Sequence, residues 1–162
     1  MVQGRIIHAS CVQMGARAVL ILGASGAGKS SLALALMAIG GRLVADDRTI
    51  LRRAGAQLIA DCPPAIRGRI EARGLGILAA EAAGPVPVGL VVDLDRVEDR
   101  RLPPARSIRL AGVMLPLVLG PLRPGLAPAL RQFALCGRAD HDGAGNRQED
   151  EMTPDHRAGQ QA

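Results

Sequence analysis

The stretch that decides the fold is Gly23-Ala24-Ser25-Gly26-Ala27-Gly28-Lys29-Ser30. It is a complete G-x-x-x-x-G-K-[ST] phosphate-binding loop, in which backbone N–H groups surround phosphate oxygens. Lys29 is the only lysine among the 20 lysine and arginine residues of the chain. An ammonium group is a compact charge on a thin stem, so it fits inside such a loop where the wider guanidinium does not. Residues 23–30 are therefore predicted to bind a nucleoside triphosphate or a similar polyphosphate, with Lys29 at the β- and γ-phosphates.

The residues around this loop predict a strand–loop–helix–strand unit. The apolar run Ala18–Leu22 predicts a buried strand that leads into the loop. Residues Ser30–Ile39 are rich in alanine and leucine and predict a helix, which ends at a Gly-Gly pair. Leu43–Ala45 is the next predicted strand, and Asp46 and Asp47 follow it directly. This context makes the loop motif specific, because phosphate loops join a strand to a helix.

The remainder of the chain predicts mostly β-structure. Gly74 and Gly76 interrupt one β-rich stretch and predict a close approach of another backbone segment. A final helix is predicted near the C-terminal end of the folded region. The predicted strands lie at 6–14, at 50–60 (a hairpin turning at 54–56), at 88–94 and, as a pair, within 107–119; the predicted helix is 126–136. The fold class is therefore α/β with a phosphate loop and a mixed β-sheet.

Length and composition predict one folded domain at residues 1–136 and a disordered acidic tail at 137–162. Residues 1–137 carry 17 basic and 9 acidic side chains, whereas residues 138–162 carry 3 basic and 6 acidic ones with no apolar periodicity. The basic body suits anionic partners such as a nucleotide. With one phenylalanine, no tyrosine and no tryptophan, the chain lacks the aromatic platforms on which single-stranded nucleic acids stack, so no nucleic-acid partner is expected.

The cysteines and the apolar runs predict a cytoplasmic protein. Cys11, Cys62 and Cys136 are odd in number and widely spaced, which is typical of reduced thiols rather than of a disulfide framework or a zinc site. The first residues lack the apolar run of a signal peptide. No apolar stretch approaches the roughly 20 residues that span a bilayer, so no membrane partner is expected.

Phosphoryl transfer also requires carboxylates, and two candidates compete for that role. Leu90-Val91-Val92-Asp93 has the pattern of a Walker B strand, which would make Asp93 the metal ligand of an ordinary ATPase or small-molecule kinase. Asp46-Asp47 instead ends the strand after the phosphate-loop helix. The residues by themselves leave both alternatives open.

Four motifs together resemble the C-terminal catalytic domain of the bacterial HPr kinase/phosphorylase family. They occur in the family's order: Ile7-His8-Ala9, the loop 23–30, Arg42-Leu43-Val44-Ala45-Asp46-Asp47, and Glu71-Ala72-Arg73-Gly74-Leu75-Gly76-Ile77. The resemblance covers roughly residues 5–80 and is weak beyond them. The "A-D-D" and "R-G-L-G-I" signatures are much more specific than the loop alone. The chain looks like the truncated form of this family found in some proteobacteria, which lacks the N-terminal domain.

The resemblance implies a fold, an activity and a set of site residues. The fold would be a phosphate-loop α/β domain akin to phosphoenolpyruvate carboxykinase. The activity would be ATP- and Mg²⁺-dependent phosphorylation of a serine in the phosphocarrier protein HPr, in regulation of the phosphotransferase system, with phosphorylase as a second, less supported activity. The implied catalytic residues are His8, Lys29, Asp46 as general base, and Arg101; the implied Mg²⁺ ligands are Ser30, Asp47 and Glu71. A homo-oligomer is implied too, since the family forms hexamers.

Two alternatives to this function stay open at this point. The chain could be a small-molecule kinase or ATPase that uses Asp93 as its Walker B residue, or a nucleotide sensor that binds ATP without transferring phosphate. Replacing Asp46 and Asp93 one at a time separates the first alternative from the HPr kinase. Tight nucleotide binding without transfer would favour the sensor.

Overall fold

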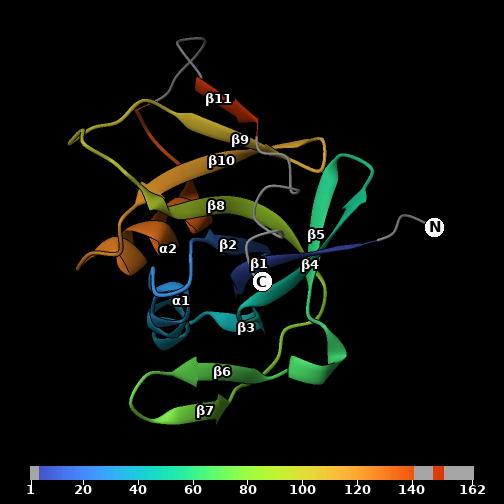
Figure 1. Ribbon diagram of the computed structural model, residues 1–162. Helices are drawn as coiled ribbons and strands as arrows, with labels where there is room; N and C mark the ends of the chain where they lie inside the picture. Colours follow the sequence, from blue (N-terminus) through green and yellow to red (C-terminus); the bar gives the residue numbers. More distant parts are fainter. Residues whose placement is uncertain (1–3, 141–147, 152–162) are drawn as a thin grey trace.

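A nine-stranded mixed β-sheet forms the centre of the protein (Figure 1). The computed structural model describes residues 4–140 and the backbone of residues 148–151. Along the sheet the strands are ordered β11-β9-β10-β8-β2-β1-β4-β5, and β3 pairs with β1. The strands are β1 (Arg5–Met14), β2 (Arg17–Leu22), β3 (Arg42–Ala45), β4 (Arg48–Ala54), β5 (Gln57–Asp61), β8 (Val86–Val97), β9 (Arg106–Leu110), β10 (Val113–Gly120) and β11 (Gln148–Glu151).

The pairing confirms the predicted mixed sheet and adds a closure that the sequence did not predict. β8 runs parallel to both β2 and β10, whereas β1 is antiparallel to β2, β3 and β4. At the far edge, β5 returns to pair with the start of β8, through Ile59 opposite Pro87 and Ala60 opposite Val86. Strands β8, β2, β1, β4 and β5 therefore close on themselves, and this removes an exposed sheet edge.

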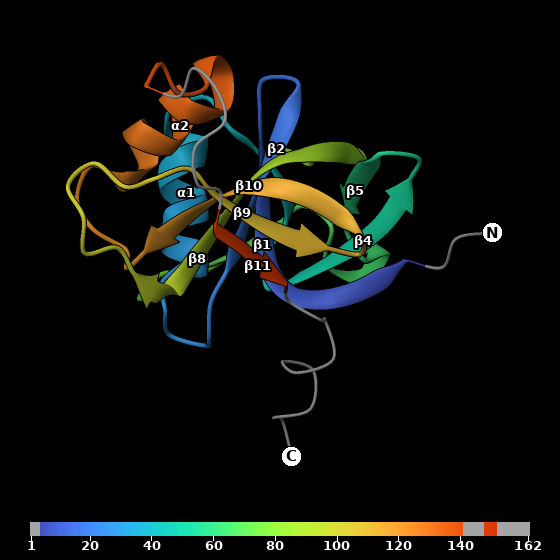
Figure 2. The same ribbon diagram turned by 90° about the horizontal axis from the view of Figure 1, so that it is seen from above.

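Two apolar cores lie on opposite faces of this sheet. Helices α1 (Lys29–Ala38) and α2 (Leu126–Cys136) cover one face side by side (Figures 1 and 2), and their leucines pack on alternate residues of β1, β2 and β8. The other core fills the space that the closed strands surround, with Leu20, Leu58 and Val91 fully buried. The aromatic ring of Phe133 packs against the helix-side core only partly buried, so aliphatic packing supplies most of the burial, as the composition predicted.

The predicted strand–loop–helix–strand unit is confirmed, with ends that differ by one residue. β2 leads into the loop, α1 begins at Lys29, and β3 follows at Arg42. Gly40 ends the helix with a φ of +108°, a backbone conformation that favours glycine. The N–H of Gly41 then donates to the carbonyl oxygen of Leu36 at 2.9 Å. This turn brings β3 back alongside β1.

A separate two-stranded hairpin projects from the sheet and carries the family-like signature. It consists of β6 (Arg69–Ala72) and β7 (Gly76–Ala79), after a short 3₁₀ helix at Pro64–Ile66, and stands apart in Figure 1. The prediction that Gly74 and Gly76 mark a close backbone approach is wrong, because a Cβ on either would meet nothing within 4 Å. Their φ values of +84° and +134° show that they serve the hairpin turn instead.

The end of the chain departs in one place from the sequence prediction. Residues 148–151, inside the predicted disordered tail, form β11, whose backbone pairs in parallel with β9. Their Gln-Glu-Asp-Glu sequence gave no strand signal. The rest of the predicted tail beyond residue 140 lies outside the described residues, and the division into a domain at 1–136 and a tail stays a prediction. Within the described ranges, no helix is long and apolar enough to cross a bilayer.

Thiol labelling should distinguish the three cysteines. Cys11 is fully buried in β1, and burial raises the pKa of its thiol far above its usual range. Cys62 is also buried, which raises its pKa, whereas Cys136 is exposed at the end of α2. Because the thiolate is the reactive form, we expect iodoacetamide to modify one cysteine in the native protein and all three in denaturant. Peptide mapping checks this, and rapid native labelling of Cys11 would contradict the fold.

Candidate active site

The phosphate loop lies between the end of β2 and the start of α1, and its backbone suits an anion. The N-cap residue Gly28 has a φ of +103°, which a residue with a side chain rarely adopts. The N-terminus of α1 has neither a capping side-chain hydrogen bond nor an acidic residue in its first turn. The N–H groups of a first helical turn have no partner within the helix and carry a partial positive charge. This helix end is therefore available to phosphate oxygens.

Two contacts hold the loop in shape. Lys29 is 6% exposed, and its ammonium group donates to the carbonyl oxygens of Gly23 at 2.9 Å and Ala24 at 3.1 Å. The N–H of Ala24 in turn donates to both carboxylate oxygens of Asp95, at 3.0 and 2.9 Å. Lys29 thus already lies inside the loop, as the sequence predicted, and Asp95 on β8 anchors the first turn.

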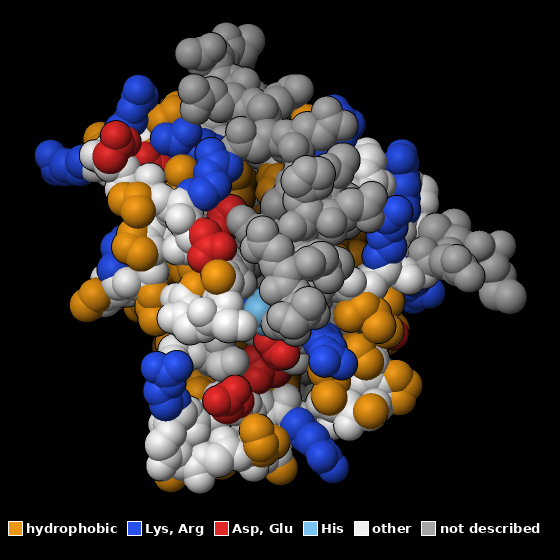
Figure 3. Space-filling model, in the orientation of Figure 1, with side chains coloured by type: hydrophobic (Ala, Val, Ile, Leu, Met, Phe, Trp, Pro, Cys, Tyr) orange, Lys and Arg blue, Asp and Glu red, His pale blue; other side chains and the backbone are white. Residues whose placement is uncertain are grey.

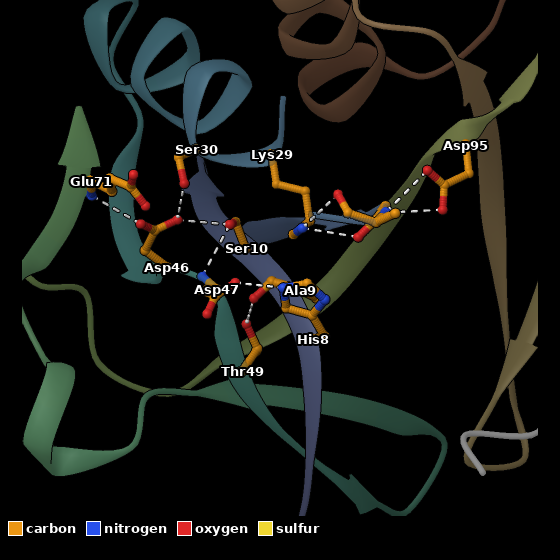
Figure 4. A network of polar contacts seen from close by, with 12 residues as sticks. His8, Ala9, Ser10, Lys29, Ser30, Asp46, Asp47, Thr49, Glu71 and Asp95 are labelled. Atoms are coloured by element: carbon orange, nitrogen blue, oxygen red, sulfur yellow. Dashed lines mark hydrogen bonds and ion pairs between the residues drawn. The ribbon is translucent and has the colours of Figure 1, made fainter. Parts of the chain in front are cut away.

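Asp46 is a buried carboxylate in contact with the phosphate loop (Figure 4). Its Oδ1 accepts hydrogen bonds from the hydroxyls of Ser10 and Ser30, both at 2.8 Å, and its Oδ2 accepts one from the N–H of Glu71 at 3.0 Å. A carboxylate offers about four acceptor positions, so most of those of Asp46 are occupied. Asp46 therefore joins β1, the loop serine and the signature hairpin.

Asp47 is adjacent in sequence but differs in environment. Its φ is +65°, in the left-handed region that aspartate tolerates better than most residues. This turn directs its carboxylate away from that of Asp46 and beside the ring of His8, whose Nε2 pairs with Oδ1 of Asp47. The Asp47 side chain is 60% exposed and that of His8 is 27% exposed. The space-filling view shows acidic side chains grouped next to the pale-blue histidine (Figure 3).

The phosphate loop, Lys29 and Asp47 line a cavity of about 310 Å³, whereas Asp46 and His8 lie behind it and are not among its lining residues. Its walls come from distant parts of the chain: the phosphate loop, the β3–β4 turn through Asp47, and the signature hairpin through Glu71 and Arg73. Leu122, which follows β10, closes one side. The cavity therefore combines an anion-binding loop, a lysine, an arginine and exposed carboxylates, which are the groups that positioning and neutralising a transferring phosphoryl group requires.

The oxygen donors at the cavity suit Mg²⁺ when it arrives with a nucleotide. Mg²⁺ prefers oxygen ligands, keeps several waters, and is bound through one or two carboxylates together with substrate phosphates. The hydroxyl of Ser30 and the carboxylate of Asp46 are in hydrogen-bond contact, and the backbone of Glu71 contacts the same carboxylate. Within the described residues, no cluster of three or more acidic, histidine or cysteine side chains forms a metal cage.

Two of the residues considered from sequence lie elsewhere. Arg101 does not line the phosphate cavity; it lines a second cavity beside α2, in the segment that joins β8 to β9. Asp93 is 2% exposed within β8, opposite Leu22 of β2, and accepts a hydrogen bond from the N–H of Asp95 at 3.0 Å. Asp93 thus supports the residue that anchors the loop and is not among the residues lining the cavity.

Sequence reasoning missed Ser10 and Asp95. Ser10 donates to Asp46 and accepts the N–H of Asp47 at 3.2 Å, so one hydroxyl orients both aspartates. A signal for it existed, because Ser10 follows His8 by two residues on one strand and alternate residues share a face. Asp95 follows Asp93 by two residues in the same way, but only the parallel pairing of β2 with β8 brings its strand beside the loop.

A β2–loop–α1 unit that delivers a lysine and a serine to a cavity lined by carboxylates defines a phosphate-loop domain of the kinase type. Residues 1–84 match the family described as HPr Serine kinase C-terminal domain, so the match spans just over half of the chain. The chain belongs to this family. The further likeness to phosphoenolpyruvate carboxykinase stays a prediction.

Individual relatives agree with this assignment. The HPr kinase/phosphorylase of Caldanaerobacter subterraneus subsp. tengcongensis is 37% identical over 132 residues, covering 74% of this chain and 43% of the relative. That of Exiguobacterium sp. is 36% identical, covering 74% and 42%. The structure of the Hpr(Ser) kinase/phosphatase from Coxiella burnetii superposes with a TM-score of 0.68 at 29% identity, covering 81% of this chain and 94% of that one. The match thus spans less than half the length of these two sequence relatives.

Proposed function

We propose that this protein is an ATP- and Mg²⁺-dependent serine kinase that phosphorylates an HPr-type phosphocarrier protein. One observation carries the proposal: the cavity of the phosphate loop also contains the exposed carboxylate of Asp47, which is paired with His8 from another strand. A binding site for phosphate alone would not need an oriented, accessible base. The names of the relatives supply the substrate, because the sequence relatives are HPr kinase/phosphorylases.

We assign the phosphate groups of ATP to the loop 23–30. The N–H groups at the start of α1 would receive the phosphate oxygens, and Lys29 would neutralise the β- and γ-phosphates after giving up its contact with a loop carbonyl. Arg73, at the opposite wall of the cavity, would add a second positive charge. Bound Mg²⁺ would supply charge neutralisation between the β- and γ-phosphates.

The geometry supports carboxylate roles in the opposite order from the sequence prediction. Asp47 is exposed to the cavity and would accept the proton of the substrate serine hydroxyl, while His8 orients its carboxylate. Asp46 is buried against the hydroxyl of Ser30, so it would hold Mg²⁺ together with Ser30 and Glu71. In the reverse reaction, phosphate would attack phosphoserine, and protonated Asp47 would return the proton to the leaving serine oxygen.

We also propose a cellular compartment and an oligomeric state for this protein. The three cysteines are free thiols, which is typical of a reducing compartment and supports a cytoplasmic site of action. Assembly into a homo-oligomer rests on the family resemblance alone, and light scattering of the purified protein would test it.

Intact-protein mass spectrometry tests the proposed activity. The purified chain is mixed with Mg²⁺-ATP and the HPr-type proteins of the same organism, and we expect one added phosphoryl group on a serine. The variant Asp47→Asn should bind ATP but transfer none. Saturable ATP binding without transfer to any carrier protein would contradict the proposed kinase activity and favour the nucleotide-sensor alternative. Hydrolysis of ATP that survives Asp47→Asn but not Asp93→Asn would indicate the Walker B alternative.

A further inference from the structure

A second cavity, of about 510 Å³, lies beside α2 and is not used by the proposed reaction. One wall is the edge of α2, the floor is the helix-side face of β10, and the other wall is the segment that joins β8 to β9. Its lining is mainly apolar and includes Met114, Val118, Leu126, Leu130 and Phe133. Its volume falls within the range of about 300–1,000 Å³ that is usual for small-molecule sites.

The strand pattern of β10 explains why this cavity is open. Leu115, Leu117 and Leu119 point into the core on the opposite face of the sheet and are buried. Met114 and Val118 point toward the helix side, where they are only partly buried. Helix α2 packs on α1, β1 and β2, so it covers the middle of the sheet and leaves the face of β10 uncovered within the described residues.

The rim of the cavity is positively charged, because its lining holds five arginines and one acidic residue, Glu98. Arg106 is neutralised by Glu98, at 2.9 Å, with both side chains nearly buried, and the guanidinium of Arg106 holds the pKa of that carboxyl below its usual range. Arg138 is paired with Asp140. Arg100 and Arg101, by contrast, are exposed and line the cavity, and the charge of Arg100 also helps to lower the pKa of Glu98. The apolar floor therefore lies beneath two exposed cations.

We propose that this cavity binds a small organic anion, with an apolar body on the floor and one carboxylate, sulfonate or phosphate group at Arg100 and Arg101. The apolar body would be favoured by burial against Met114, Val118 and Phe133. The acidic group would gain charge-assisted hydrogen bonds from the two guanidinium groups. An uncharged ligand of the same shape would lose the second contribution but keep the first.

The cavity adjoins the phosphate site through two neighbouring residues. Arg123 lines the second cavity, while Leu122 lines the phosphate cavity. Leu122 lies directly against the loop, since its Cδ2 atom would be 2.6 Å from a Cβ built on Gly28. A ligand that displaces Arg123 therefore acts on the phosphate loop through Leu122. We expect the anion to change nucleotide affinity, with a reciprocal effect of the nucleotide on the anion; this second step rests on the proposed nucleotide binding.

Fluorescence titration with 8-anilinonaphthalene-1-sulfonate tests the site directly, with uncharged N-phenyl-1-naphthylamine as the matched probe. We expect one sulfonate probe per folded chain. The double variant Arg100→Ala/Arg101→Ala should weaken its binding by about tenfold or more, and that of the neutral probe by about twofold or less. Ala129→Trp, on the exposed edge of α2 that lines the cavity, should remove both probes. Arg109→Ala, outside the cavity, is the control.

Several outcomes would overturn the site. Probe binding that is unaffected by Ala129→Trp would show that the probe binds elsewhere. Equal losses of affinity for both probes in the arginine variant would show that charge plays no part in the binding. Displacement of the probe by ATP but not by inorganic tripolyphosphate would show that the cavity receives the nucleoside. If the number of probe molecules bound per chain at saturation falls as the protein concentration rises, a second copy of the chain occupies the cavity. Circular dichroism melting curves of every variant exclude unfolding as the cause.

The coupling has its own test. In the wild-type protein, saturating sulfonate probe should shift the dissociation constant for ATP by about fivefold or more. Leu122→Ala should remove this shift and leave probe binding intact. An unchanged dissociation constant in the wild type, with both ligands bound, would overturn the coupling but not the anion site. Absence of ATP binding in the wild type would count against the proposed function and not against the cavity.

Discussion

Replacing Lys29 with methionine is expected to weaken ATP binding by about a hundredfold or more, since hydrogen bonds to charged groups contribute about 1.5–3 kcal/mol each. Methionine retains most of the aliphatic stem and removes the ammonium group, which is the one lysine charge of the chain. Lys29→Arg should fail as well, because the guanidinium is too wide for a loop whose carbonyls now bind the ammonium at 2.9 and 3.1 Å. Isothermal titration with ATP measures both losses.

The control for this prediction is Arg109→Ala, an exposed cation away from both cavities. It should bind ATP as the wild type does, which separates loss of a specific contact from loss of general positive charge. Because Lys29 also holds two loop carbonyls, thermal unfolding of each variant must be measured. ATP binding that survives in a folded Lys29→Met protein would show that the loop does not use its lysine for phosphate.

The second large effect is expected from asparagine substitutions at Asp46 and Asp47, which should impair different steps of the reaction. Asp47→Asn should lower the rate of transfer to the carrier protein by about 10²–10⁴-fold, the usual contribution of a general base, with little change in the dissociation constant for Mg²⁺-ATP. Asp46→Asn should weaken nucleotide binding in the presence of Mg²⁺ but not in its absence, since Asp46 lies against Ser30 and Glu71. Single-turnover transfer and titrations with and without Mg²⁺ measure these effects.

This pair of variants decides between the two orders of roles. If Asp46→Asn abolished transfer and left Mg²⁺-dependent binding intact, while Asp47→Asn changed the metal requirement, the order predicted from sequence would be correct. Asparagine is a suitable replacement at both positions because it conserves size and can still accept hydrogen bonds. Ser10→Ala is a useful third variant, since Ser10 contacts both residues and should impair both functions partly.

The elements that were predictable from sequence are those specified by local chemistry. The strand–loop–helix–strand unit, the β4–β5 hairpin and α2 were found because apolar runs, glycines and the loop motif lie close together along the chain. The phosphate-binding residues were found for the same reason, since Gly23–Ser30 is continuous. The hairpin that carries Glu71 is recognisable from sequence only as a signature. The role of its glycines is not, because a turn and a close backbone approach both favour glycine.

The parts that were not predictable depend on which strands become neighbours. Asp95 anchors the loop only because β8 pairs with β2, and Arg101 lies in another cavity because the segment after β8 turns toward α2. β11 has no apolar alternation, so its strand arises from backbone pairing with β9 alone. Such pairings join residues far apart in sequence, and single-residue preferences carry no information about them.

The sequence by itself determined that this protein has a phosphate loop with a lysine, between a buried strand and a helix, because that motif is contiguous and each of its residues has a local reason. Only the tertiary structure decided which carboxylate is buried and which is exposed. Asp46 and Asp47 are identical side chains one residue apart, and their difference comes from the left-handed φ of Asp47 and from the β1 residues His8 and Ser10. A neighbouring strand buries one carboxylate against the loop serine and leaves the other in the cavity, which no local pattern can specify.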